Sequence, residues 1–213
     1  MALLSTRKST PRKKGIARRQ QLLRAARALL ETHELDDISL GDVAAAAHVP
    51  KSSAYHFYAD IKDVYASLLA GVQEELLKVL EAPIRTRMRD WRHIVEILTE
   101  RGVDFYAHSK ASMRLQIDPR IPVDLKLRDR RNDAALGSIH EQHIDRVFVL
   151  PGIPNRAAIF FRAVGIADLM FMLSVLEHGR VTPEMAREAQ LAMCAYLGCY
   201  LPPDLPRRRR KGE

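Results

Sequence analysis

Residues 39–58, SLGDVAAAAHVPKSSAYHFY, constrain the fold of this chain more than any other stretch. Ser39 can cap a helix that continues through apolar residues at helical spacing and four consecutive alanines. His48 and Val49 interrupt that pattern, and Pro50 suits the first turn of a second helix because it has no amide hydrogen to lose. The stretch therefore predicts a helix-turn-helix, a module that places its second helix in the major groove of DNA.

The second helix has two different faces. Ala54 and Tyr58 share an inward face, whereas hydroxyls, an amine and an imidazole share the outward face and can hydrogen-bond phosphates and base edges. The outward residues are Lys51, Ser52, Tyr55 and His56, with Ser53 at the edge. An amphipathic helix over residues 16–33 supplies the third helix of a small core. The alternative is a helical hairpin whose polar face is only solvated.

Residues 18–64 resemble the N-terminal DNA-binding domain of the TetR family of bacterial transcription regulators. The resemblance is carried by LLRAARALLE, by SLGDVAAAAHVPKSSAYHFY and by DIKDVY. It implies a homodimeric, all-helical repressor with a C-terminal ligand-binding and dimerisation domain.

The chain departs from the family pattern at five positions, which bear on individual contacts more than on the fold. His48 stands at the turn glycine, Pro50 at the serine or threonine before the recognition helix, and Ser52 at a glycine within it. Phe57 replaces a histidine or tyrosine that contacts phosphate, and Ile61 replaces a lysine, with Lys62 one place later.

Positive charge is concentrated at the two ends of the chain. The sequence has 34 Lys+Arg and 26 Asp+Glu, a net charge of +8, yet residues 61–206 carry nineteen of each sign. Residues 1–27 hold nine basic side chains and no acidic one, a composition that attracts phosphate, although a solvated disordered arm is the alternative. We predict phosphate contacts from Arg18, Arg19, Lys51, Tyr55 and Lys62, base-edge contacts from Ser52, Ser53 and His56, and a further DNA contact from Ser39.

The chain is predicted to be all-α, because helical patterns follow one another from Asp60 onward without a convincing strand. We expect a disordered basic arm over residues 1–14 and a three-helix DNA-binding domain over 15–60. We expect a larger helical ligand-binding and dimerisation domain over 61–203, followed by a disordered basic tail over 204–213.

The last two predicted helices, residues 156–177 and 183–201, are apolar on nearly every side. Such helices must bury two faces, which favours a homodimer that presents two recognition helices to a palindromic operator. A central helix in a monomer is the alternative. The predicted interface comprises Phe161, Gly165, Met172, Leu176, Leu191, Ala195 and Gly198.

Aromatic and polar side chains of the larger domain could enclose a small-molecule effector, and plain core packing is the alternative for each of them. The candidates are Trp91, Phe105, Tyr106, Met113, His140 and Phe160. His140 and His143 lie three apart, but without a third matched ligand we predict no metal site.

No phosphate loop, nucleophile elbow or zinc-protease motif is present in the sequence, so we expect neither an enzyme nor a cofactor. The apolar run from Ala163 to Leu176 has fourteen residues, too few to span a bilayer, and a cytoplasmic protein is expected. The sequence thus predicts a ligand-responsive, sequence-specific transcription regulator that acts as a repressor. One alternative is a sequence-nonspecific architectural DNA-binding protein. Another is a helical small-molecule-binding protein or enzyme whose helix-turn-helix is vestigial.

Overall fold

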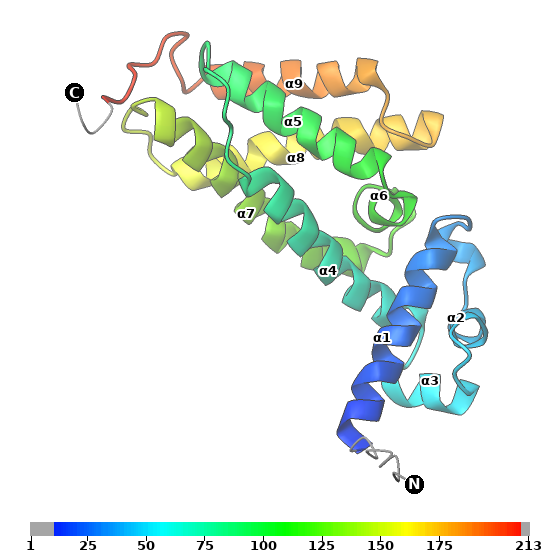
Figure 1. The fold of residues 1–213 in the computed structure, drawn as a ribbon. Coiled ribbons are helices and arrows are strands. Elements are labelled where there is room, and N and C mark those ends of the chain that lie inside the picture. Colours follow the sequence, from blue (N-terminus) through cyan, green and yellow to red (C-terminus); the bar gives the residue numbers. More distant parts are fainter. Residues whose placement is uncertain (1–10, 210–213) are drawn as a thin grey trace, which may run out of the picture. The chain divides into compact units, whose positions relative to one another are not determined.

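The structure, a computed structural model, describes the backbone of residues 11–209 and their side chains except those of residues 11–13 and 128–133. The expected all-α fold is confirmed, because the described residues form helices and no strand beyond one isolated bridge. The chain divides into two compact units, Met1–Leu68 and Leu69–Glu213 (Figure 1). The helices are α1 (Pro11–Leu30), η1 (Leu35–Asp37), α2 (Leu40–Ala46), α3 (Lys51–Phe57), α4 (Ile61–Glu81), α5 (Trp91–Ala107), α6 (Lys110–Gln116), α7 (Val123–Val147), α8 (Arg156–His178) and α9 (Pro183–Gly198).

The first unit packs α1, α2, α3 and the start of α4 around a small apolar core. Every one of these elements contributes buried side chains, so no helix can be removed without exposing the others. The Tyr65 hydroxyl donates to the Leu35 carbonyl at 2.8 Å, and burial raises the pKa of Tyr65 to about 12. The main buried residues of this core are Leu22, Ala26, Leu30, Leu35, Ile38, Leu40, Val43, Ala44, Val49, Ala54, Tyr58, Val64 and Leu68.

The second unit is built around α8, which lies between α7 and α9 (Figure 1). The α7 and α8 backbones approach closely at Gly137, where an added Cβ would lie 2.7 Å from the Phe161 nitrogen. The core is apolar and includes Trp91 and Phe160, both fully buried. Glycine at position 137 is therefore a packing requirement of this unit.

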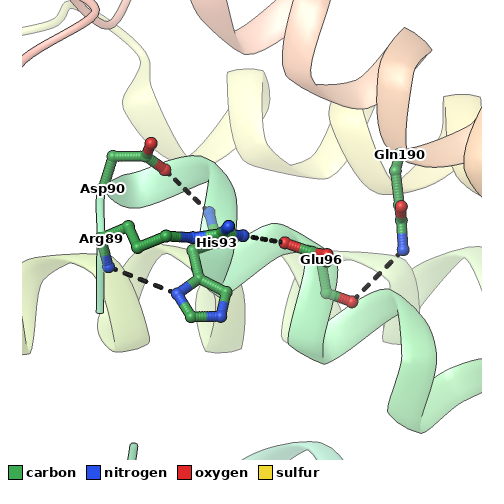
Figure 2. A network of polar contacts seen from close by, with 5 residues as sticks. All are labelled: Arg89, Asp90, His93, Glu96 and Gln190. Carbon is green, nitrogen blue, oxygen red and sulfur yellow. Dashed lines mark hydrogen bonds and ion pairs between the residues drawn. The ribbon is translucent and has the colours of Figure 1, made fainter. Parts of the chain in front are cut away.

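A polar network fixes the start of α5 and its neighbour α9 (Figure 2). The Asp90 carboxylate caps the helix by accepting from the His93 amide at 2.9 Å. The Arg89 guanidinium pairs with Glu96 at 2.8 Å, and the Arg89 backbone amide donates to the His93 Nδ1. Gln190, on α9, reaches the Glu96 carbonyl at 3.5 Å. These contacts hold the first two turns of α5 in place.

The segment after α9 is ordered and docked, contrary to the tail expected from residue 204. The Val149 amide donates to the Pro206 carbonyl at 2.7 Å, and the Arg208 amide donates to the Val147 carbonyl at 2.9 Å. The Arg207 guanidinium binds the Met88 carbonyl and lies 5.2 Å from the centre of the Phe148 ring. The prediction failed because backbone pairing with a distant segment leaves no local signature. Residues 210–213 lie outside the described part of the chain.

Two other boundaries differ from the sequence prediction. Residues 11–14, assigned to the disordered arm, open α1, whereas residues 1–10 lie outside the described residues. The units divide within α4, after Leu68 rather than at residue 60, because the first turns of α4 complete the small core.

The apolar helix α8 ends one residue after the predicted range 156–177. It has 23 residues and, among the described residues, is the one helix long and apolar enough by length and composition to cross a membrane, whereas the sequence prediction considered only its fourteen-residue apolar run. Its buried residues pack among α7 and α9, and the core helix of a soluble protein passes the same test of length and composition.

Candidate functional site

The first helix of the predicted helix-turn-helix begins with a reciprocal cap. The Asp42 amide donates to the Ser39 Oγ at 3.2 Å, and the Ser39 amide donates to the Asp42 carboxylate at 2.9 Å. The Ser39 hydroxyl also donates to that carboxylate, and this hydrogen bond lowers the pKa of Asp42. Two amides that a helix start leaves unpaired are thereby satisfied, which fixes where α2 begins.

The turn between the two helices is closed by backbone hydrogen bonds. His48 adopts φ 52°, in the left-handed region that favours glycine. It occupies the position at which the family pattern has the turn glycine. The His48 amide donates to Ala45 and the Val49 amide donates to Ala44, both at 3.0 Å, and Val49 is buried. This is a Schellman ending with its apolar contact, and it turns the chain directly into α3.

Helix α3 buries one face and exposes the other. Ala54 is fully buried and Tyr58, which follows the helix, is 4% exposed, whereas Tyr55 is 52% exposed. The exposed face combines an amine, two hydroxyls and an imidazole, which suits phosphates and base edges. Lys51, Ser52, Tyr55 and His56 are exposed, and Ser53 and Phe57 are half-buried at the edges.

Arg19 contributes to the architecture of the first unit. Its Nε donates to the Tyr58 hydroxyl at 3.1 Å, and its guanidinium lies 5.5 Å from the centre of the Tyr58 ring. A third contact joins it to the Ser67 hydroxyl at 3.4 Å. Arg19 therefore ties α1 to the end of α3 and to α4, a role that sequence reasoning missed because the partners lie 39 and 48 residues away.

The other predicted phosphate-binding residues lie at the surface of the first unit. Arg18 on α1 and Lys62 at the start of α4 are exposed. Lys51 lies over the start of α2, since a Cβ at Gly41 would meet its Cε at 3.0 Å and its Nζ at 3.3 Å. Its ammonium also contributes to lowering the pKa of Asp42. A long flexible side chain in this position can still extend to a phosphate.

The second unit leaves an apolar stripe exposed on α8 and α9. Leu176 is 64% exposed and Leu191 is 62% exposed, and Leu169 adds a third large side chain. Gly165, Ala195 and Gly198 are exposed beside them, whereas Phe161 and Met172 are half-buried. The residues predicted for a dimer interface thus lie at or near the surface of these two helices.

The six residues predicted to enclose an effector do not gather around one cavity. Trp91 and Phe160 are fully buried core, Met113 is buried and Phe105 packs against the core. Among the described residues, Tyr106 and His140 line a common cavity, which holds about 40 Å³, room for a few waters at most. Sequence periodicity identifies buried aromatic residues but does not separate a packed core from a cavity wall.

The two α7 histidines are held by backbone carbonyls. The His140 Nδ1 contacts the Leu136 carbonyl and the His143 Nε2 contacts the Leu80 carbonyl, each at 2.9 Å. Burial lowers the pKa of His140 to about 4 and also lowers the pKa of His143. Both side chains therefore serve as neutral core polar groups, and the described residues contain no cluster of three metal-binding side chains.

A larger pocket of about 360 Å³ opens between α6, α7 and α8. Gln116 on α6 and Lys126 on α7 supply polar groups to its lining, and neither was among the predicted site residues. The sequence carried no distinct signal for Gln116, because residues 111–117, ASMRLQI, contain two other polar side chains.

The fold matches solved structures of known proteins, whereas no protein-family model and no curated protein matches the sequence significantly. A TetR-family transcriptional regulator from Streptomyces coelicolor aligns with a TM-score of 0.65 and 20% identity over 86% of this chain and 99% of that one. A putative TetR-family regulator from Mesorhizobium loti aligns with a TM-score of 0.63 and 16% identity over 91% and 100% of the two chains. The multidrug binding protein EbrR, complexed with imidazole, aligns with a TM-score of 0.57 and 17% identity over 84% and 94%.

At such identities the likeness extends to the fold, and it covers both units together with the helix-turn-helix described above. This chain has the fold of the TetR-family transcriptional regulators.

Proposed function

We propose that this protein is a homodimeric, cytoplasmic transcription regulator that binds duplex DNA through α3 and acts as a repressor released by a small molecule. The observation that carries the proposal is the exposed polar face of α3, which includes Lys51, Tyr55 and His56 and lies opposite the buried Ala54. Helix α3 follows a closed turn and packs through the buried Ala54, so it presents these groups in a set orientation, as groove reading requires.

Selection of bound fragments from random duplex DNA tests the proposal. We expect a recovered palindrome and a preference over random duplex of at least about 10³. Equal affinity for all sequences would favour an architectural protein, and no DNA retention would favour a small-molecule-binding protein. The same selection from genomic DNA would identify the operator for a reporter assay. If the protein is a repressor, deleting its gene should raise expression of the reporter.

Two substitutions on α3 separate backbone binding from base readout. Lys51→Ala should weaken binding to all sequences and flatten its salt dependence, because one phosphate contact is lost. His56→Ala should change the preferred sequence, because an imidazole at a base edge contributes to discrimination. Lys78→Ala and His33→Ala change the same residue types at exposed positions outside α3 and should leave affinity and preference intact.

The dimer is supported by the exposed stripe on α8 and α9, whose leucines would otherwise remain in water. Two copies joined through four helices would present two recognition helices to half-sites about 34–36 Å apart or a multiple of that. Leu176→Glu with Leu191→Glu should give a monomer by analytical ultracentrifugation and weaken operator binding. Leu127→Glu, at a leucine 61% exposed on α7, is the matched control and should remain dimeric.

Release by a small molecule is supported by the 360 Å³ pocket in the second unit. The likeness to EbrR, a protein solved with imidazole bound, adds to that support. The ligand must bind the conformation that does not hold DNA more tightly than the one that does. Measuring operator affinity with and without candidate ligands tests this part separately.

A further inference from the structure

The pocket between α6, α7 and α8 has the size and walls of a small-molecule site. Its volume of about 360 Å³ falls within the usual range for such sites, and it is far larger than the cavity beside His140. Phe161, Leu169 and Met172 supply an apolar wall from α8. This wall can accommodate a hydrocarbon or aromatic body.

Gln116 lines this pocket and carries an unpaired buried acceptor. The residue is 8% exposed, and its Oε1 is the one fully buried side-chain N or O atom of the described residues that has no hydrogen-bond partner. Buried polar atoms are almost always paired, and leaving one unpaired is costly. A ligand with an O–H or N–H group in the pocket would satisfy it.

Lys126 places a positive charge at the same pocket. Its ammonium donates to the thioether sulfur of Met172 at 3.1 Å, and among the described residues no carboxylate pairs with it. A thioether is a weak acceptor and carries no charge. Arg162 adds a second cation to the lining, whereas Asp168, the one acid among the described lining residues, has a further interaction of its own. The described lining residues therefore carry an excess of positive charge.

We propose that this pocket binds an amphipathic organic anion that also carries a hydroxyl or amide donor. The anionic group would pair with Lys126, the donor would bind the Gln116 Oε1, and the body would pack on Phe161 and Met172. This inference deepens the proposed function and rests on it, because three residues of α8, Phe161, Gly165 and Met172, belong both to the pocket and to the proposed dimer face. Occupancy can then shift the dimer through α8.

Calorimetric titration of the full chain with four eight-carbon probes tests the ligand class. We expect 3-hydroxyoctanoate to bind best and octanoate about three- to tenfold more weakly, because the hydroxyl donor is missing. 1-Octanol should bind about tenfold more weakly than octanoate, because the charge-assisted pair is lost, and octylammonium should bind more weakly still.

Variants connect each preference to one side chain. Lys126→Met should abolish the preference for octanoate over 1-octanol, and Lys126→Arg should retain it. Gln116→Met should abolish the preference for the hydroxylated acid, because no acceptor remains. Lys78→Met, an exposed lysine on α4, should behave as the unchanged chain. Circular dichroism checks each fold, with Lys126→Gln replacing any Lys126→Met protein that does not fold.

Three outcomes would each overturn the inference. The first is equal affinity for octanoate and octylammonium, and the second is no effect of Lys126→Met or Lys126→Gln. The third is no binding of any probe at millimolar concentration. DNA retention by the same preparation separates this failure from failure of the proposed function. If DNA is retained and no probe binds, only the ligand class is wrong. If the probes bind as expected and DNA is not retained, the proposed regulator is wrong and the pocket chemistry stands.

Discussion

The helix-turn-helix and the α8-centred unit are both helical, yet they are specified over different distances along the chain. The cap of α2 joins Ser39 to Asp42, and the turn joins Val49 to Ala44. In the second unit the Trp91 indole binds the Pro202 carbonyl, and Gly137 lies against the backbone of Phe161. The helix-turn-helix is therefore specified largely by local hydrogen bonds, and the packing around α8 by contacts between distant helices.

The largest expected effect follows from removing the central aromatic residue of the second unit. Trp91→Ala should lower the free energy of unfolding by about 3–5 kcal/mol, the usual range for a buried tryptophan. Hydrogen exchange followed by mass spectrometry should show lost protection in peptides of residues 69–209 and little change in residues 11–68. Tyr200→Ala, at a residue 39% exposed, is the control. Equal loss of protection in both units would show that they unfold together.

Gly137 tests the close approach of α7 and α8. Gly137→Ala should lower the free energy of unfolding by up to about 3 kcal/mol, because the new Cβ overlaps backbone atoms that cannot move alone. Gly71→Ala is the matched control, since nothing lies within 4 Å of its Cβ position, and it should stabilise α4 by about 0.5–1 kcal/mol. Denaturation in urea measures both. A stabilising Gly137→Ala would contradict the observed helix spacing.

His140 gives the second unit a pH dependence. Its pKa is about 4 in the folded chain against 6.5 when unperturbed, so the unfolded chain binds the extra proton between these values. The free energy of unfolding should therefore fall as pH is lowered through 6.5, by about 2 kcal/mol at pH 5. In urea denaturation at pH 7.5 and pH 5, the His140→Leu variant should lack this fall in the free energy of unfolding. His33→Leu, at an exposed histidine, should retain it, and an unchanged slope in His140→Leu would exclude the assignment.

The smallest effect concerns the cap of α2. Ser39→Ala should lower the stability of the first unit by about 1 kcal/mol, because the Asp42 amide loses its acceptor. Ser52→Ala, an exposed serine within α3, should change stability by only a few tenths of a kcal/mol in the same assay. Hydrogen exchange at residues 40–46 reports the difference. If the two variants behave alike, the cap does not set the start of α2.

The sequence was sufficient to predict the elements that depend on neighbouring residues. The cap at Ser39, the turn at His48 and the opposite faces of Ala54 and Tyr55 all follow from residue type and spacing, and the structure has each of them. The all-α fold follows from the helical spacing of the apolar residues. The role of His48 shows the limit of such reasoning, since its identity alone does not fix φ.

The features that sequence reasoning missed depend on contacts between distant residues. Arg19 was predicted to bind phosphate, and the structure also assigns it to Tyr58. Trp91 and Phe160 were predicted to line a ligand site, yet both are plain core. Gln116 and Lys126 were not predicted at all, because only the packing of α6, α7 and α8 brings them to one pocket. Helical periodicity reports which residues are inside, not what lies beside them.

The docked segment after α9 affects how this protein can be engineered. Arg207 and Arg208 bind groups of the α4–α5 connection and the end of α7, so a truncation before residue 207 removes structural contacts together with positive charge. An affinity tag fused directly after Arg208 would disturb this docked segment, whereas a linker beginning beyond residue 209 would leave it in place. Truncations made for crystallisation should therefore retain the chain through Arg209.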